Sequence, residues 1–167
     1  MEAYKDQDAR VKRSIITALR EYETDEVTTF ILSLMENEEN DYLVSSALST
    51  LIKIDLDKAQ EKFDWAMEQE SHGETIRSTA LGILTEEKTD SNLVKLKELA
   101  VYGVAPYNLR GSIFSRITDY QEDNPDLIDY FADHINDPHR RVRWTCANQI
   151  IRHGNIDQFG EFLAMAD

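Results

Sequence analysis

The side chains with the strongest potential for chemistry are four histidines, one cysteine and many carboxylates. A zinc peptidase of the His-Glu-x-x-His type needs two imidazoles one helical turn apart and a general-base carboxylate between them. The histidines are His72, His134, His139 and His153, and no two have that spacing. The sequence also lacks a glycine-rich phosphate loop, a Gly-x-Ser-x-Gly elbow and a Cys/His pairing. We therefore predict a chain that is not itself an enzyme and has neither a metal site nor a cofactor.

The remaining reactive groups have simple structural interpretations. Adjacent or near-adjacent acids such as Asp55/Asp57 and Glu122/Asp123 fall in expected loops, where carboxylates are normally solvated. His134 lies at the edge of an apolar stripe, as expected for a hydrogen-bonded, half-buried imidazole. The single cysteine, Cys146, excludes an internal disulfide, and its neighbours in the pattern below are apolar. A buried thiol without a nearby cation stays protonated and unreactive.

Charge and hydropathy narrow the classes of partner. The 167 residues include 32 acids and 18 bases, a formal net charge of −14, whereas nucleic-acid binding depends on Lys and Arg neutralising phosphates. Nucleic acid is therefore an unfavourable partner. The one basic cluster, His139 to Arg143, is interpreted as a solvated helix start, with a local anionic contact as the alternative. The sequence has neither an apolar run of ~20 residues nor a signal segment. We therefore expect a cytoplasmic protein that does not enter a membrane.

The elements that carry these residues follow a repeat. Five nine-residue segments align without gaps, the second beginning 32 residues after the first and each later one 33 residues after its predecessor. Positions 1, 5 and 9 of this register are apolar, and position 4 is always Ser or Thr. The segments are Val11 to Leu19, Leu43 to Leu51, Ile76 to Leu84, Leu109 to Ile117 and Val142 to Ile150. Apolar residues four apart form one face of a helix, so Ile15 and Ile113 at position 5 are predicted to be core.

A second apolar helical pattern follows each aligned segment. Examples are Val27, Phe30, Ile31 and Leu34 in the first copy and Phe159, Phe162 and Leu163 in the last. Ser71 and Glu74 fit a capping box that would start the third copy. A fixed period of this length predicts stacked helical hairpins that share one core. We therefore predict an all-α fold without a sheet: a right-handed α-solenoid of about five hairpins and about ten helices. Its single domain, 1–167, would comprise repeats at about 7–39, 40–71, 72–105, 106–137 and 138–167.

The closing segment Asp137-Pro138-His139-Arg140-Arg141-Val142-Arg143 resembles the "Asp-Pro, then Val-Arg" opening of HEAT repeats. Register position 2 holds Lys12, Val44, Arg77, Arg110 and Arg143. The resemblance implies that the four cations form an inter-repeat ladder and pair with acids of adjoining repeats. Tetratricopeptide repeats have a similar length, but their Trp/Gly/Tyr pattern is missing, as is the Thr-Pro-Leu-His motif of ankyrin repeats.

The order of the copies and the closing basic block resemble the C-terminal helical domain of M1-family zinc aminopeptidases. This resemblance implies a domain without zinc ligands that packs on a catalytic domain and helps to close its substrate chamber. A stand-alone HEAT-like adaptor that binds a basic protein or peptide is the alternative. A HEAT-fold DNA-repair glycosylase is a third hypothesis, but it would need a basic groove that the net charge disfavours.

A partner surface could include aromatic residues that lie off the apolar stripes. Trp65 lies about 200° around the helix from Phe63, and Tyr130 is off-stripe in a similar way. Packing on an adjacent repeat and anchoring a partner are both open for these two residues. Acidic helix ends such as Glu38-Glu39 would favour a basic protein or peptide, with solvated turns as the alternative. Exposed apolar surface on the end repeats would favour a homodimer.

Overall fold

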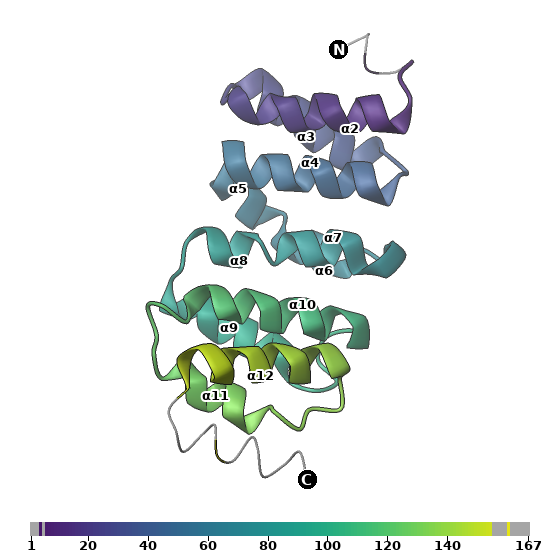
Figure 1. The fold of residues 1–167 in the computed structure, drawn as a ribbon. Coiled ribbons are helices and arrows are strands. Elements are labelled where there is room, and N and C mark those ends of the chain that lie inside the picture. Colours follow the sequence, from purple (N-terminus) through teal and green to yellow (C-terminus); the bar gives the residue numbers. More distant parts are fainter. Residues whose placement is uncertain (1–3, 5, 155–159, 161–167) are drawn as a thin grey trace. The chain divides into compact units, whose positions relative to one another are not determined.

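The fold was analysed in a computed structural model, which describes residues 4, 6–154 and 160 (Figure 1). Within these residues every regular element is a helix and no strand occurs, which confirms the predicted all-α class. The second helix predicted for the last copy, with Phe159, Phe162 and Leu163, lies outside the described residues. The chain forms two compact units, Met1–Glu86 and Glu87–Asp167. They are described separately below.

Unit 1 contains three aligned segments and the helices that follow the first two. Its elements are α2 (Ala9–Ala18), η1 (Leu19–Glu21), α3 (Asp25–Asn37), α4 (Asp41–Ile54), α5 (Leu56–Glu61), α6 (Phe63–Glu68), η2 (His72–Glu74), α7 (Thr75–Ala80) and α8 (Ile83–Glu86). Two helices predicted as single elements are broken, one between α5 and α6 and the other between α7 and α8. The break before α8 falls at Leu81 and Gly82, and glycine favours a helix less than any residue except proline.

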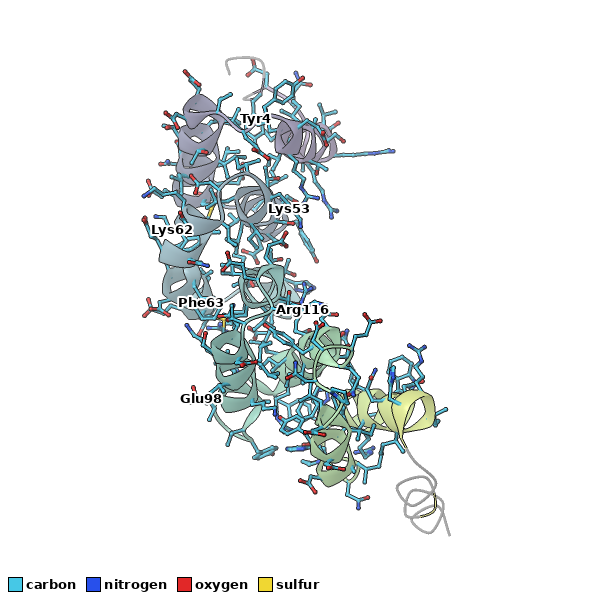
Figure 2. All side chains as sticks on the ribbon, turned by 90° about the vertical axis from the view of Figure 1, so that its left-hand side faces the viewer. Tyr4, Lys53, Lys62, Phe63, Glu98 and Arg116 are labelled. Atoms are coloured by element: carbon cyan, nitrogen blue, oxygen red, sulfur yellow. The ribbon has the colours of Figure 1, made fainter. Side chains whose placement is uncertain are left out.

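The helices of unit 1 form two layers. The helices from the aligned segments, α2, α4 and α7, lie side by side, with α4 in the middle (Figure 1). Helix α3 packs on α4, and α6 packs on α7, from the second layer. In Figure 2, Lys53 of α4 and Lys62 between α5 and α6 mark the two layers of this unit. Each helical pair therefore buries its apolar face partly against its neighbour.

Unit 2 repeats this arrangement with helices α9 (Asp90–Ala100), α10 (Tyr107–Ile117), η3 (Thr118–Tyr120), α11 (Leu127–Asp133) and α12 (Arg140–His153). Helices α10 and α12, from the fourth and fifth aligned segments, lie side by side, with α9 against α10 and α11 against α12 (Figure 1). Arg116 of α10 and Glu98 of α9 lie on different layers of this unit (Figure 2).

The register places its apolar positions in the core. The position 5 residues Ala47, Ala80, Ile113 and Cys146 are all fully buried. In the first copy, Ile15 is only half-buried and Val11 is 39% exposed. Among the described residues, α2 is covered by α4 on one side and has no equivalent helix on the other, which accounts for this difference.

Hydroxyl groups at register position 4 bond back to the preceding helical turn. Ser46 Oγ donates to the carbonyl of Tyr42 at 2.7 Å, and Thr79 Oγ1 donates to that of Thr75 at 3.0 Å. Such a bond gives the hydroxyl a hydrogen-bond partner within its own helix, so no group on a neighbouring helix is needed. This explains how a Ser or Thr is accommodated beside the apolar stripe.

The capping box predicted at Ser71 and Glu74 does not form as predicted. Gly73 and Glu74 both have positive φ, 62° and 58°, so an extra turn precedes α7. Ser71 Oγ accepts instead from the amide of Ile76 at 3.1 Å, and the Glu74 carboxylate accepts from Arg77 Nη1 at 2.7 Å. The segment does begin a helix, as predicted, but the extra turn gives Ser71 and Glu74 other hydrogen-bond partners.

In the described part of the chain, no helix has the length and apolar character needed to cross a bilayer.

Candidate functional site

The four cations at register position 2 differ in their contacts and in their exposure. Arg110 is 2% exposed, and its Nε donates to the carbonyl of Ala100 at the end of α9 at 3.0 Å. Its Nη1 donates to Asp137 Oδ1 at 2.7 Å, and that same oxygen accepts from the amide of His139. The buried guanidinium thus links the end of one second helix to the segment that begins the next copy. A cation at this place also offsets the negative end of the α9 dipole.

Arg77 and Arg143 have related contacts. Arg77 Nε donates to the carbonyl of Met67 near the end of α6 at 2.7 Å, and Arg143 Nη1 donates to the carbonyls of Asp137 and Pro138. Lys12 approaches Glu38 at 4.0 Å. The carboxylates near Lys12, Arg110 and Arg77 thus belong to the same copy as each cation, within the repeat bounds given above. The bonds to the preceding copy run instead to backbone carbonyls, from Arg77 to Met67, from Arg110 to Ala100 and from Arg143 to Asp137.

The histidines and Cys146 form no metal-binding cluster. In the part of the chain that the structure describes, no three His, Cys, Asp or Glu residues are placed to share an ion. His139 Nδ1 accepts from the amide of Arg141 at 3.2 Å, and burial lowers the pKa of its imidazole. Cys146 is fully buried, and burial raises the pKa of its thiol to about 12. His139 therefore caps the start of α12, and Cys146 packs in the core.

The two aromatic residues singled out from the sequence are both half-buried. Trp65 lies on α6, and its carbonyl accepts from the side chain of Gln69. Tyr130 stacks on Phe114 with ring centroids 5.7 Å apart, and Lys97 Nζ lies 4.9 Å from the Tyr130 ring centroid. Burial raises the pKa of the Tyr130 phenol to about 12. Tyr130 therefore packs against other side chains of unit 2, and less of its surface is accessible to a partner.

A different aromatic residue is the most exposed large hydrophobic side chain among the described residues of unit 2. Trp144 is 68% exposed on α12, and Ile151, two helical turns later, is 59% exposed. Arg140 and Arg152 flank this pair and are also exposed. We call these four residues, Arg140, Trp144, Ile151 and Arg152, the α12 outer face. Sequence reasoning missed it, although Trp144 occupies register position 3, where the other copies have Arg13, Ser45, Ser78 and Gly111.

Position 3 faces the following copy in α4 and α10, whereas Arg13, at this position in α2, is exposed. Ser45 Oγ lies 2.7 Å from Thr79 Oγ1 of α7, and Ile52, the register equivalent of Ile151, is 6% exposed. In unit 2, a Cβ added to Gly111 would lie 2.6 Å from Cδ of Arg141, so α12 approaches α10 closely there. The α12 outer face is thus a helix-packing face that no described residue covers.

The α12 outer face is also cationic. The segment 138–154 has no aspartate or glutamate but contains Arg140, Arg141, Arg143 and Arg152. In a chain with a net charge of −14, this is a local reversal of charge. Trp and Arg are the residue types enriched in the parts of protein interfaces that contribute most to binding energy.

Comparisons of the chain with protein-family models, with curated proteins and with solved structures find no match.

Proposed function

We propose that this chain is a non-catalytic helical-repeat domain whose function is to bind another protein. The observation that carries the proposal is the α12 outer face, where a helix-packing surface bears Trp144 at 68% exposure. Leaving such an indole in water is unfavourable, whereas its burial by a partner is a frequent source of binding energy. The packing of α2, α4 and α7 in unit 1, and of α10 and α12 in unit 2, supports a repeat architecture.

The finer form of the proposal is a right-handed HEAT-like solenoid that runs through the whole chain. The five aligned segments, the cations at register position 2 and the Asp137-Pro138 opening support it. Small-angle scattering of the purified chain tests the architecture, because an extended solenoid and two hairpin stacks folded onto each other differ in radius of gyration. A radius no larger than that of a compact chain of this size would contradict the solenoid.

The specific role that we propose is that of a C-terminal domain of an M1-like aminopeptidase, packed on its catalytic part. This rests on the order of the copies and the closing basic block, 137–143. The coding frame upstream of Met1 provides the test. A segment with His-Glu-x-x-His in the same frame is the expected finding, and a stop codon there would remove this role.

A stand-alone adaptor is the second candidate, and the α12 outer face favours it because none of the described residues covers this surface. We predicted a basic partner from the acidic helix ends, but Glu38 and Glu36 are near Lys12 and Lys62. The cationic α12 outer face instead favours an acidic partner. Protein binding itself is tested by affinity purification with the wild type, Trp144→Ala and Trp65→Ala.

The expected result of that purification is a protein that the wild type recovers and the Trp144→Ala variant loses. Circular dichroism of both variants checks that they fold. If all three chains recover the same proteins in equal amounts, neither tryptophan contacts a partner and the proposed surface is wrong.

A further inference from the structure

We propose that the α12 outer face docks an acidic amphipathic helix of a partner protein, seated on α12 as α7 and α8 are seated on α4. This inference rests on the proposed function, and it specifies the class of partner and its mode of binding. The arguments are register equivalence within the chain, the distribution of charge along α12 and the spacing of its exposed apolar residues.

The packing of α4 shows what this face receives. Ser45 contacts Thr79 of α7, and Ile52 is buried. Lys53 pairs with Glu86 of α8, the following helix in the same layer. Trp144, Ile151 and Arg152 are the register equivalents of Ser45, Ile52 and Lys53. A helix seated on α12 in the same way would therefore place a carboxylate opposite Arg152, as Glu86 lies opposite Lys53.

Charge selects an acidic occupant. Arg140 lies at the beginning of α12 and Arg152 near its end, and no acid lies between them. Both side chains are exposed, so their guanidinium groups can form bidentate contacts with carboxylates. An occupant with acids toward both of its ends would match them, whereas a basic segment would be repelled.

The apolar spacing selects a helix. Trp144 and Ile151 are seven residues apart, so they lie on the same face of α12, two turns from each other. A helix with apolar residues at i, i+3 or i+4, and i+7 presents the complementary stripe. The larger Trp144 would insert between side chains of the occupant, in contrast to the small Ser45 that lies at this position in α4.

A second copy of the chain fits less well. The equivalent partner element would be α2 with η1. Glu21 is the register equivalent of Glu86, but the other charged side chains of residues 9–21 are those of Arg10, Lys12, Arg13 and Arg20, so this element is cationic overall, as α12 is. Nucleic acid fits less well because the chain as a whole carries −14. Crosslinking from position 144 distinguishes both of these occupants from a partner protein.

The experiment uses the full chain with a photo-crosslinking benzophenone amino acid at position 144, expressed in the cells from which the protein comes. Two further chains carry the crosslinker at exposed control positions, Tyr22 and Tyr102, which are 59% and 65% exposed. Mass spectrometry identifies the crosslinked segment. The expected product at position 144 is a protein segment with acids flanking an apolar i, i+3/i+4, i+7 pattern.

A synthetic peptide of that segment is then titrated against the purified wild type, Trp144→Ala, Arg152→Glu and the matched control Arg13→Glu. We expect at least ~10-fold weaker binding for Trp144→Ala. Arg152→Glu should weaken binding about 5-fold or more and also reduce its salt dependence. Arg13→Glu, which makes the same charge change on α2, should leave the affinity unchanged. The bound peptide should be helical by circular dichroism.

The failures are separable. A protein crosslinked only at Tyr22 or Tyr102, or a basic or non-helical segment at position 144, overturns this inference while protein binding stands. A crosslink from position 144 to nucleic acid or to another copy of the chain also overturns it. Equal affinity of the wild type and Trp144→Ala for the synthetic peptide would overturn this inference too. Absence of a crosslinked protein at all three positions would overturn the proposed function as well.

Discussion

At the scale of single residues, Arg110 shows how a buried charge becomes part of the fold. Its guanidinium is 2% exposed and binds the Ala100 carbonyl and the Asp137 carboxylate. Its carbon Cζ also lies 5.4 Å from the ring centroid of Tyr102 and 5.6 Å from that of Phe114. Removing a partner from such a pair leaves an uncompensated charge, which costs more than the pair itself contributes.

We therefore expect Asp137→Ala to lower the free energy of unfolding by about 3–5 kcal/mol. The matched control is Asp123→Ala, because Asp123 pairs with Lys88 on the surface at 3.8 Å and should contribute at most about 1 kcal/mol. Urea denaturation followed by circular dichroism measures both. If both variants lose the same free energy of unfolding, the Arg110 guanidinium must find water or another partner when Asp137 is removed, and the prediction is wrong.

Cys146 gives a prediction about alkaline pH. Burial raises the pKa of its thiol from 9.0 to about 12. Because the folded pKa is the higher one, the stabilisation linked to the protonated thiol is complete below pH 9 and is lost as the pH rises from about 9 to 12. Iodoacetamide labelling at pH 8 should be ~100-fold or more slower in the native chain than in urea, because burial disfavours the thiolate that reacts. Comparable rates would place the thiol in solvent.

At the scale of elements, the register separates core from surface along a single helix. Ile113 at position 5 is fully buried between α10 and its neighbours, whereas Arg13 at position 3 of α2 is exposed. Ile113→Asn should cost on the order of 2–5 kcal/mol, because it places an amide in an apolar layer. Arg13→Glu should change the stability by about 0.5 kcal/mol at most. Thermal melts with similar losses for both would contradict the register.

The close approach of α10 and α12 depends on Gly111. Since a Cβ there would lie 3.0 Å or less from three carbons of Arg141, Gly111→Val should destabilise unit 2 by about 1–3 kcal/mol. The same change in an Arg141→Ala background should cost less, because the opposing side chain has gone. Urea denaturation of the two single variants and the double variant completes the cycle. Additive losses would mean that the two residues do not compete for space.

At the scale of the whole molecule, the chain consists of two compact units joined at 87–89. Lys88 in this segment is exposed, so we expect limited trypsin digestion to cut there first and release fragments near 1–88 and 89–167. Lys88→Gln should remove that first cut without unfolding the chain. An initial cut within α4 or α10 would show instead that one of the units opens before the joining segment does.

The helical class, and the buried face of most of the described helices, could be predicted from the sequence. The 33-residue period places Ala47, Ala80, Ile113 and Cys146 at equivalent positions, and helical geometry then requires them to share one side. The positions of nine of the ten predicted helices could be read in the same way, since apolar periodicity is a local property. The breaks within two of them and the turn at Gly73 and Glu74 depend on backbone angles that the periodicity does not contain.

The exposure of residues off the apolar stripes depends on the packing of the helices and could not be predicted from the sequence. Trp65 and Trp144 both lie off their apolar stripes, yet Trp65 is half-buried whereas Trp144 is 68% exposed. Exposure at such a position depends on whether a neighbouring helix covers it, as α7 covers Ser45 on α4. That neighbour is distant in sequence, so the local pattern of α12 is the same with or without it. The candidate binding surface therefore became visible only when the helices were placed side by side.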